Sequence, residues 1–437
     1  MPAPVLANAN VKAALADAHE RYSAANKKSR SRYDDACTAF PGGSTRTVLF
    51  YPPFPLTLVK GEGAHVWDAD GHKYIDFLGE YSAGLFGHSD PVIRAALDQA
   101  LDGGIDLGGH NTLEAKLAAA VCDRFPSIEL VRFTNSGTEA NLMAISAARA
   151  IVKRPKIMVF EGGYHGGVFH FAAGGSPINA PFDFVVAQYN DTDGTVTLID
   201  RIGSDLAAVV VEPMMGNGGC IPAEKAFLQA LRDATARHGA LLIFDEVMSS
   251  RLSPGGLQEA YGVIPDMTTL GKYLGGGMSF GAFGGRADLM AFFDARRPDA
   301  FRHAGTFNNN VLTMSAGLAA MSIYTPDVAR RHNARGDALR DRLNALAREK
   351  GAGMQVTGMG SMLNVHMRRG PILSPADVAK QNFDLRDLLF FDLLDQGIWM
   401  ARRGMAAVSL AISEHDYDRL VAAVEEFIVQ RRSLVSA

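Results

Sequence analysis

Two charged residues of the sequence directly follow apolar runs and are placed to do chemistry. Lys272 lies among the glycines of TLGKYLGGG, just after the short apolar run that ends at Leu270. A lysine that forms a Schiff base with an aldehyde must be partly desolvated and needs space beside it, and this setting provides both. Asp245 ends the apolar run LLIFD, where a buried carboxylate needs a cationic partner. The ordinary alternatives are that Asp245 caps the next helix or pairs with a nearby arginine, whereas a functional partner would be the protonated ring nitrogen of a ligand, and the residue alone does not decide between them.

Two glycine-containing motifs earlier in the chain supply further parts of a ligand site. In NSGTEAN, Ser136, Gly137 and Thr138 precede a predicted helix, where backbone N–H groups and hydroxyls can bind a phosphate. The S-x-x-E spacing of this motif is also that of an ordinary capping box, which would only start the helix. In GGYHG, Tyr164 can lie flat against a planar ring, although a glycine-rich segment with a tyrosine is more often simply a loop.

Together, these features are what pyridoxal 5′-phosphate (PLP) requires of a protein. PLP needs an anchor for its phosphate, an aromatic side chain against its ring, a carboxylate at its ring nitrogen and a lysine for the Schiff base. The candidates occur at predicted strand ends, where α/β sheets bind their ligands. A dinucleotide-dependent dehydrogenase would instead need G-x-G-x-x-G after an early strand, and a cofactor-free binding protein leaves Lys272 and Asp245 unexplained. We therefore predict a PLP enzyme with Lys272 and Asp245 as its catalytic residues.

The elements that must position these residues follow from the spacing of the apolar runs. From about residue 110 to residue 326, short apolar runs rich in Val and Ile alternate with helical segments. This alternation predicts an α/β fold with a mostly parallel seven-stranded sheet that is buried on both faces. The predicted strands are residues 130–134, 156–160, 182–187, 207–212, 240–245, 267–270 and 281–285.

The two ends of the chain predict a second, smaller α+β domain. The N-terminal segment predicts a charged amphipathic helix over 11–35 and a meander of short strands, with the hairpin signal Asp70-Gly71 before the last of them. The C-terminal segment predicts three helices and two strands. We expect this division: 1–69, the N-terminal segment of the smaller domain; 70–326, the large PLP-binding domain; 327–437, the C-terminal part of the smaller domain.

The composition excludes several other classes of protein. The 437 residues include 43 Lys and Arg against 47 Asp and Glu, a formal net charge of −4, and no basic stripe, which argues against nucleic acid or a membrane surface as a partner. No apolar run approaches the roughly 20 residues of a membrane span, and no signal peptide pattern begins the chain. The 3 cysteines form no CxxC pair and the histidines show no zinc spacing, so we expect neither a disulfide framework nor a metal site. A cytoplasmic enzyme is the expected class.

Six motifs and one long N-terminal run carry a resemblance to a known family. The run PLTLVKGEGAHVWDADGHKYIDFLGEYSAGLFGHSDP extends it over nearly the whole chain. The motifs are NSGTEAN (135–141), GGYHG (162–166), VVVEP (209–213), LIFDEVM (242–248), TLGKYLGGG (269–277) and, more loosely, HAGTFNNN (303–310). By these motifs the chain resembles the class III aminotransferases of the fold-type I PLP superfamily, which implies a PLP-dependent transaminase.

The resemblance implies a role for each matching position at the cofactor. Lys272 would form the Schiff base, and Asp245 would hold the ring nitrogen. The phosphate would be bound by Ser136, Gly137 and Thr138.

Four further positions take their roles from the same resemblance. Tyr164 would cover one face of the ring and Val247 the other. Glu212 would lie near the O3′ side of the cofactor. Thr306 would reach the phosphate bound by the partner subunit, which implies a homodimer with shared active sites.

Two branches of this family compete for the function. PGGSTRTVLF and DEVM resemble the glutamate-1-semialdehyde aminomutases, but their run G-T-x-x-G-N-P is replaced here by GTFNNNV (305–311). FYPPFPLT, GEYSAGLFGHS, GGHN and SFGAFGGR instead resemble the β-amino-acid (β-phenylalanine-type) aminotransferases. We expect the second function: ping-pong transfer of an amino group from an aromatic or aliphatic β-amino acid to a 2-oxo acid such as 2-oxoglutarate or pyruvate. An aminomutase-like isomerase and a broad amine ω-transaminase are the alternatives.

Two arginines are the expected substrate-binding residues. The resemblance implies that Arg46 in the N-terminal loop and Arg403 in the C-terminal part bind carboxylates, with Arg402 as a neighbour that competes for the second role. A guanidinium binds a carboxylate through two parallel hydrogen bonds, so two arginines near the lysine suit a site that alternates between an amino acid and an oxo acid. The ordinary alternative for each is a solvated or ion-paired loop arginine.

Overall fold

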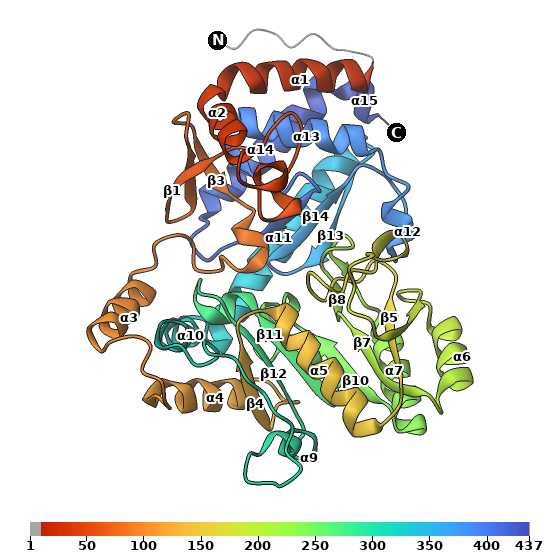
Figure 1. Cartoon of the computed structure of the whole chain (residues 1–437). Helices are drawn as coiled ribbons and strands as arrows, with labels where there is room; N and C mark the ends of the chain where they lie inside the picture. Colours follow the sequence, from red (N-terminus) through yellow and green to blue (C-terminus); the bar gives the residue numbers. More distant parts are fainter. Residues whose placement is uncertain (1–9, 437) are drawn as a thin grey trace.

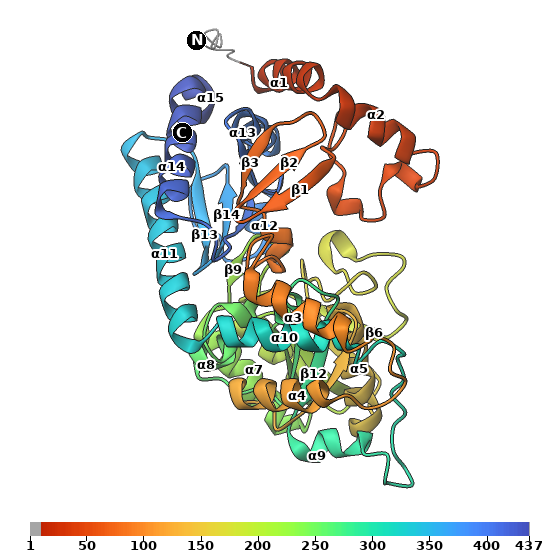
Figure 2. The same cartoon turned by 90° about the vertical axis from the view of Figure 1, so that its left-hand side faces the viewer.

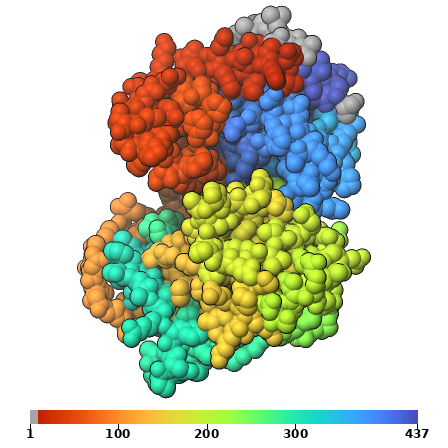
Figure 3. Space-filling view, turned by 45° about the vertical axis from the view of Figure 1, so that its right-hand side comes forward, coloured from red at the N-terminus to blue at the C-terminus, as the bar shows by residue number. Residues whose placement is uncertain are grey.

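The computed structural model describes residues 10–436 and places both ends of the chain in one lobe, above a larger lobe built from the middle of the chain (Figure 1). The space-filling view shows the N-terminal and C-terminal segments side by side in this upper lobe (Figure 3). Across the described range, no helix combines the length and the apolar character needed to span a membrane.

The α-helices are α1 (Val11–Ala25), α2 (Lys27–Ala36), α3 (Pro91–Asp102), α4 (Thr112–Arg124), α5 (Gly137–Val152), α6 (Thr192–Ile202), α7 (Lys225–His238), α8 (Gly256–Tyr261), α9 (Ala287–Met290), α10 (Val311–Ile323), α11 (Pro326–Glu349), α12 (Pro375–Val378), α13 (Phe383–Asp395), α14 (Glu414–Gln430) and α15 (Arg432–Val435).

The larger lobe is built on a seven-stranded sheet with the strand order β4-β12-β11-β10-β7-β5-β6. β12 is antiparallel to both of its neighbours, and the other neighbouring strands are parallel, so the predicted mostly parallel sheet is confirmed. The ends of the predicted strands agree with those of the observed strands to within one residue. The strands are β4 (Leu130–Thr134), β5 (Lys156–Phe160), β6 (Asp183–Ala187), β7 (Leu206–Val211), β10 (Leu241–Asp245), β11 (Met267–Gly271) and β12 (Gly281–Gly285).

The central strands are apolar along their whole length because helices cover both faces of the sheet. In β7, Ala208 and Val210 pack into the cluster that contains the buried side of α5, whereas Val209 and Val211 pack into the cluster that contains α7. Successive side chains of a strand point to opposite faces, so α5 and α7 lie on opposite sides of the sheet. β4, β5, β7, β10 and β11 end at the same edge, and Ser136, Tyr164, Glu212, Asp245 and Lys272 lie at or just after these ends.

The smaller lobe joins the two ends of the chain in one sheet of order β1-β2-β3-β15. β15 comes from the C-terminal part of the chain and is parallel to β3. The predicted boundary at residue 69 falls inside this sheet, because β3 pairs with β2 as well as with β15, and the exact domain limits stay a prediction. The remaining strands are β1 (Leu58–Glu62), β2 (His65–Asp68), β3 (Lys73–Asp76), β8 (Met214–Met215), β9 (Ile221–Pro222), β13 (Gln355–Met359), β14 (Met362–His366), β15 (Ile398–Trp399) and β16 (Met405–Ala407).

The single helix predicted over 11–35 is wrong, because the chain breaks at Asn26 into α1 and α2. The side-chain amide of Asn26 donates to the carbonyl of Tyr22 (2.8 Å). The backbone N–H groups of Lys28 and Ser29 donate to the carboxylate of Asp70 (2.7 and 2.9 Å), which satisfies the free N–H groups at the start of α2. The acceptor that starts the second helix thus comes from a distant part of the chain.

Two distant loops meet at the outer side of the larger lobe. α10 packs against α3 and α4 (Figure 2), which brings the loop before α4 beside the loop before α10. The side chain of Asn111 donates to the carbonyl of Asn309 (2.6 Å), and the side chain of Asn309 donates to the carboxylate of Glu114 (3.1 Å). Thr306 lies in the second loop and is exposed.

Candidate active site

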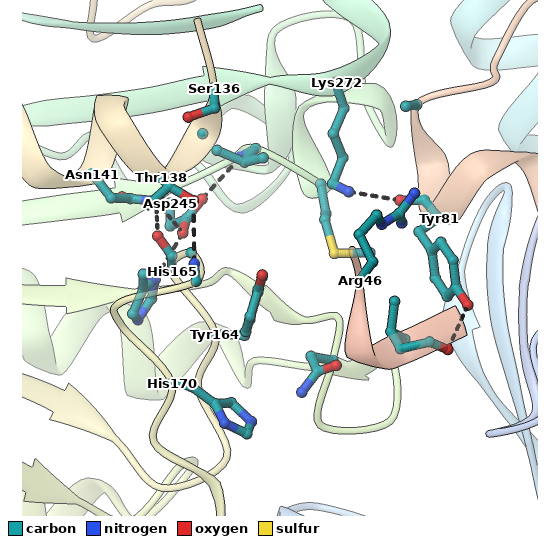
Figure 4. A pocket seen from close by; sticks show the side chains of 18 of the residues that line it. Arg46, Tyr81, Ser136, Thr138, Asn141, Tyr164, His165, His170, Asp245 and Lys272 are labelled. Atoms are coloured by element: carbon teal, nitrogen blue, oxygen red, sulfur yellow. Dashed lines mark hydrogen bonds and ion pairs between the residues drawn. The ribbon is translucent and has the colours of Figure 1, made fainter. Parts of the chain in front are cut away.

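A cavity of about 790 Å³ opens between the two lobes, at the edge of the sheet where the parallel strands end (Figure 4). Loop residues from the N-terminal part and one arginine from the C-terminal part close it from the side of the smaller lobe. Of the predicted site residues, only Thr306 is not part of its lining. The predicted residues that line it are Arg46, Ser136, Gly137, Thr138, Tyr164, Glu212, Asp245, Val247, Lys272 and Arg403.

The start of α5 forms an anion-binding cradle at the end of β4. Ser136 is the N-cap of α5, and its hydroxyl accepts the backbone N–H of Glu139 (3.1 Å). The Glu139 carboxylate accepts the backbone N–H of Asn135 (2.7 Å) rather than that of Ser136, so only half of the predicted capping box forms. The first N–H groups of a helix have no acceptor within the helix and point at whatever lies before it, which here is the cavity.

Two glycines at this cradle pack so closely against neighbouring residues that neither position has room for a side chain. A Cβ atom at Gly137 would lie 2.9 Å from both methyl groups of Val247. Gly166 has a φ of +131°, and a Cβ atom there would lie 2.7 Å from Cα of Thr138. Glycine at both positions therefore lets the start of α5 pack against Val247 and against the loop that contains Gly166.

Asp245 is a buried carboxylate whose hydrogen bonds leave one acceptor position free. Its Oδ2 accepts from Nδ1 of His165 (2.7 Å) and from the amide of Asn141 (2.8 Å), and its Oδ1 accepts the backbone N–H of Val247 (3.0 Å). Each carboxylate oxygen has two lone pairs, so Oδ2 is saturated and Oδ1 keeps one position. Because Asp245 lines the cavity, that position is available to a donor bound there.

His165 is tied to Asp245 rather than free in its loop. Burial lowers the pKa of His165, but the hydrogen bond and the negative charge of Asp245 outweigh it and leave the pKa of His165 raised. The hydrogen bond thus holds the His165 ring and the Asp245 carboxylate in fixed positions at the end of β10.

Lys272 follows the last residue of β11 and points its amine into the cavity. Its backbone is left-handed, with a φ of +55°, which is uncommon outside glycine and needs support from the surroundings. Nζ donates to the backbone carbonyl of Tyr81 (2.8 Å), which comes from the smaller lobe. Burial, followed by the positive charge of Arg403, lowers the pKa of Lys272 to about 8. A lysine in this state is a stronger nucleophile near neutral pH than an ordinary one.

This pKa leads to a direct measurement on the protein without cofactor. The neutral amine is the nucleophile, so acetylation of Lys272 by acetic anhydride will speed up as the pH rises and level off above a midpoint of about 8. Mass spectrometry of the peptide that contains Lys272 gives the rate at each pH. A midpoint at the ordinary lysine pKa of 10.5 would contradict the role of burial.

Glu212, Tyr164 and Val247 complete the part of the cavity next to the sheet. Glu212 accepts the backbone N–H groups of Tyr164 and Gly216 (3.0 Å each), and burial raises the pKa of Glu212 to about 7. The ring of Tyr164 remains 43% exposed and meets the ring of His170 edge to face, with ring centres 5.8 Å apart. The side chain of Val247 packs between Gly137 at the start of α5 and Gly271 at the end of β11. These groups offer two apolar surfaces and one carboxyl group to a planar ligand.

The two predicted arginines enter the cavity from the smaller lobe. Arg46 forms an ion pair with Glu80. Arg403 donates from Nη1 to the side-chain oxygen of Asn217 (2.7 Å), while its Nε is buried without a hydrogen-bond partner. A buried donor without an acceptor is costly, and a carboxylate in the cavity would satisfy it.

The structure separates the roles of the neighbouring arginines at 402 and 403. Arg402 pairs with Asp387 of α13 (2.6 Å) and does not line the cavity. Arg403 lines it, as the first of the two sequence alternatives predicts. The ion pair inside the smaller lobe thus holds Arg402 away from the cavity and leaves Arg403 as the arginine that lines it.

Several residues of the site were not among the predicted ones. Asn141 is the last residue of the motif NSGTEAN and a polar residue on the buried side of an alanine-rich helix, which is a detectable signal. Tyr81 and Asn217 have no such signal, because each reaches the cavity from a loop whose path depends on tertiary contacts. The other lining residues absent from the prediction include Asn135, His165, His170, Met248, Met278 and Phe280.

The arrangement fits PLP in three respects that do not depend on any sequence motif. The free N–H groups at the start of α5 suit a phosphate, the free position on Asp245 Oδ1 suits a protonated ring nitrogen, and Lys272 is a partly buried amine with a lowered pKa. These three groups come from the ends of separate strands and surround one cavity.

The fold and this site define a class of protein, and a comparison of families identifies it. Residues 50–428 match the family Aminotransferase class-III, and the chain belongs to that family. The predicted resemblance is confirmed, and the protein is a PLP-dependent transaminase with the fold of the fold-type I enzymes.

Among its relatives, the chain is 53% identical over 424 residues to the beta-phenylalanine transaminase of Variovorax paradoxus, which covers 97% of this chain and 98% of that protein. A solved structure of a beta-phenylalanine aminotransferase from the same organism superposes with a TM-score of 0.96 at 53% identity, and covers 98% of this chain and 99% of that one. The glutamate-1-semialdehyde 2,1-aminomutase of Sorangium cellulosum is 37% identical over 418 residues, or 91% of this chain and 95% of that protein. Both branches considered in the sequence are thus relatives.

Proposed function

We propose that this transaminase takes its amino group from an aromatic or aliphatic β-amino acid and delivers it to a 2-oxo acid such as 2-oxoglutarate or pyruvate. The observation that carries the proposal is a pair of arginines, Arg46 and Arg403, that face the same cavity as Lys272. The 53% identity to a beta-phenylalanine transaminase supports it.

Two arginines are needed because the two substrates differ in geometry. A β-amino acid carries its amine one carbon farther from its carboxylate than an α-amino acid does. If the reacting carbon occupies one position, the two kinds of carboxylate must be anchored at different points. Arg46 binds the carboxylate of the β-amino acid, and Arg403 binds the α-carboxylate of the 2-oxo acid and moves aside for an apolar side chain.

The residues at the strand ends are assigned to the cofactor. When bound, PLP takes up the amino group and withdraws negative charge from the carbon that carried it. The N-terminus of α5 would bind its phosphate, and the free position on Asp245 Oδ1 would accept the N–H of the ring. The negative charge of Asp245 keeps that proton in place. The assigned residues are Ser136, Gly137 and Thr138 for the phosphate, Tyr164 and Val247 for the two ring faces, and Glu212 for the side of the ring hydroxyl.

Lys272 has two tasks in this proposal. It would hold the cofactor covalently in the resting enzyme, and its free amine would move a proton to and from the reacting carbon of the substrate. A pKa of about 8 suits both tasks, because the amine can be neutral as a base and charged as an acid within a narrow pH range. The hydrogen bond from Nζ of Lys272 to the carbonyl of Tyr81 keeps the amine pointing into the cavity.

Donor and acceptor use the cavity in turn, which is a ping-pong mechanism. One lysine and one pair of arginines serve both half-reactions, so the first product leaves before the 2-oxo acid binds. The expected signature is a set of parallel lines in double-reciprocal plots when both substrate concentrations are varied.

We also propose that the protein is a homodimer and acts in the cytoplasm. The two loops that meet at Asn111 and Asn309 expose large apolar side chains, among them Leu107 (56% exposed) and Phe307 (57% exposed). Exposed apolar groups that gather in one place are typical of a surface that binds another protein. A second copy of the chain on this surface would bring Thr306 to the phosphate site of its partner.

Removing either arginine tests the substrate assignment. Arg46→Ala will raise KM for a β-amino acid such as β-phenylalanine more than tenfold, and Arg403→Ala will raise KM chiefly for 2-oxoglutarate. A lost bidentate, charge-assisted contact costs about 2–4 kcal/mol of binding. Steady-state kinetics with each substrate varied in turn gives both values.

Arg402→Ala is the matched control, because this arginine pairs with Asp387 outside the cavity and its loss leaves both KM values unchanged. Equal effects of Arg46→Ala on both substrates would contradict the assignment. A panel of β-amino acids, α-amino acids and simple amines distinguishes the proposal from a broad amine transaminase. Turnover of an amino-aldehyde substrate without added oxo acid, together with inert β-amino acids, would instead identify an aminomutase.

A further inference from the structure

The phenol ring of Tyr81 is shared by the two substrate-binding arginines. The central guanidinium carbon of Arg46 lies 5.3 Å from the ring centre, and that of Arg403 lies 5.1 Å from it. Both distances are within the range of cation–π attraction. Figure 4 shows Arg46 and Tyr81 together at the side of the cavity opposite Asp245, with Lys272 beside them.

This part of the cavity collects three cationic groups but few anions. Arg46, Arg403 and Lys272 all line it, and the charges of both arginines act on the amine of Lys272. Glu80 neutralises Arg46, whereas the hydrogen-bond partners of Arg403 are both uncharged, the amide of Asn217 and the sulfur of Met405. The π electrons of Tyr81 are therefore the negative surface that both guanidinium groups share, before any substrate carboxylate arrives.

The backbone around Tyr81 shows that its position is specifically supported. Gly79, Glu80, Tyr81 and Ser82 have φ angles of 52°, 45°, 53° and 80°, a left-handed turn that includes three residues other than glycine. Such a run persists only where its surroundings hold it in place.

The contacts that hold this turn come from two parts of the chain. The carboxylate of Asp76 accepts the backbone N–H groups of Leu78 and Gly79 (2.8 and 3.0 Å). Arg251, which is completely buried, donates to the carbonyl of Ser82 (3.2 Å). The turn thus directs three successive groups at the site: the carboxylate of Glu80 to Arg46, the ring of Tyr81 to both arginines, and the carbonyl of Tyr81 to Lys272.

We propose that Tyr81 is a positioning residue for substrate recognition, whose ring holds both arginines at the places where each binds its carboxylate. The proposal rests on the proposed function, because it assumes that Arg46 and Arg403 bind the two substrates. It goes beyond that function by making one aromatic ring responsible for the affinity of both. The hydroxyl group contributes little, since its hydrogen bond to the carbonyl of Val48 is long, at 3.3 Å.

The first test compares Tyr81→Leu with Tyr81→Phe in the holoenzyme. Leucine keeps an apolar side chain but removes the π electrons, so we expect KM to rise about tenfold for both the β-amino acid and the 2-oxo acid, with kcat changed less than threefold. Phenylalanine keeps the ring and brings both KM values back toward wild type. Calorimetric titration with glutarate, a dicarboxylate that cannot react, measures carboxylate binding without turnover and is expected to show a similar rise of Kd for the leucine variant only.

The second test keeps the shape of the ring and so does not depend on whether the leucine variant folds. Incorporation of 3,4,5-trifluorophenylalanine in place of Tyr81 weakens the negative face of the ring at nearly constant size. We expect KM for both substrates and Kd for glutarate to rise relative to Tyr81→Phe. Unchanged values in the fluorinated variant would overturn the proposal.

The two proposals can fail separately. If Arg46→Ala and Arg403→Ala raise the expected KM values but the fluorinated ring has no effect, only the role of Tyr81 is wrong. If neither arginine variant changes KM, the proposed function itself fails, whatever the ring variants show.

Discussion

Lys272→Ala will abolish transamination, with a loss of at least about 10³-fold in rate, while the protein still binds PLP. The loss is this large because a positioned base alone contributes about 10²–10⁴-fold, and this residue is also the point of covalent attachment. PLP remains bound because the cradle at Ser136–Thr138 and the carboxylate of Asp245 do not depend on the lysine. Steady-state rates and the PLP content of the purified variant measure the two effects.

A chemical readout locates the lysine without reference to activity. Borohydride reduction of the wild-type holoenzyme will fix the cofactor on the peptide that contains Lys272, and the variant will show no such label. Lys153→Ala is the matched control, because Lys153 also has a left-handed backbone (φ +58°) but is exposed at the C-terminal end of α5. Label on a lysine other than Lys272 would refute the assignment.

Asp245→Asn will lower the rate about 10²-fold or more while the protein stays folded. An amide carries no negative charge, so it cannot hold a proton on the ring nitrogen of the cofactor. The variant also loses stability, because an amide has one acceptor atom where the carboxylate accepts from His165, Asn141 and Val247. One buried donor is then left unpaired at a cost of about 1–3 kcal/mol. Single-turnover kinetics and thermal unfolding separate the two effects.

Glu246→Gln is a matched control for the loss of a buried carboxylate. Glu246 is the next residue in the chain and is fully buried, but it accepts the backbone N–H groups of Leu257 and Gln258 (2.7 and 3.0 Å) and does not line the cavity. We expect its variant to lose stability with little change in rate. A near-normal rate for Asp245→Asn would show that Asp245 serves only the structure.

The large sheet and most of the site were predictable because their signals are local. Each strand is an apolar run bounded by glycine or polar residues, and residues that follow parallel strands gather at one edge of the sheet. That rule brings Ser136, Asp245 and Lys272 together without knowledge of any distant contact.

The remaining features were not predictable because they depend on contacts between distant segments. α2 begins where Asp70 supplies its cap, and Arg402 turns away from the cavity because Asp387 lies on α13. Tyr81 reaches the arginines only through a left-handed turn that Asp76 and Arg251 hold in place. No periodicity or spacing within these segments contains that information.

The parallel pairing of β3 with β15 imposes an order on the folding of a newly made chain. These strands are roughly 320 residues apart, so at about 5–20 residues per second the ribosome needs roughly 15–60 s to synthesise the partner of β3. During that interval Tyr74, Ile75 and Phe77 lack the C-terminal part of the core in which they are buried. The larger lobe, complete near residue 326, can assemble first, and its nascent chain carries an unfinished apolar edge that molecular chaperones can bind.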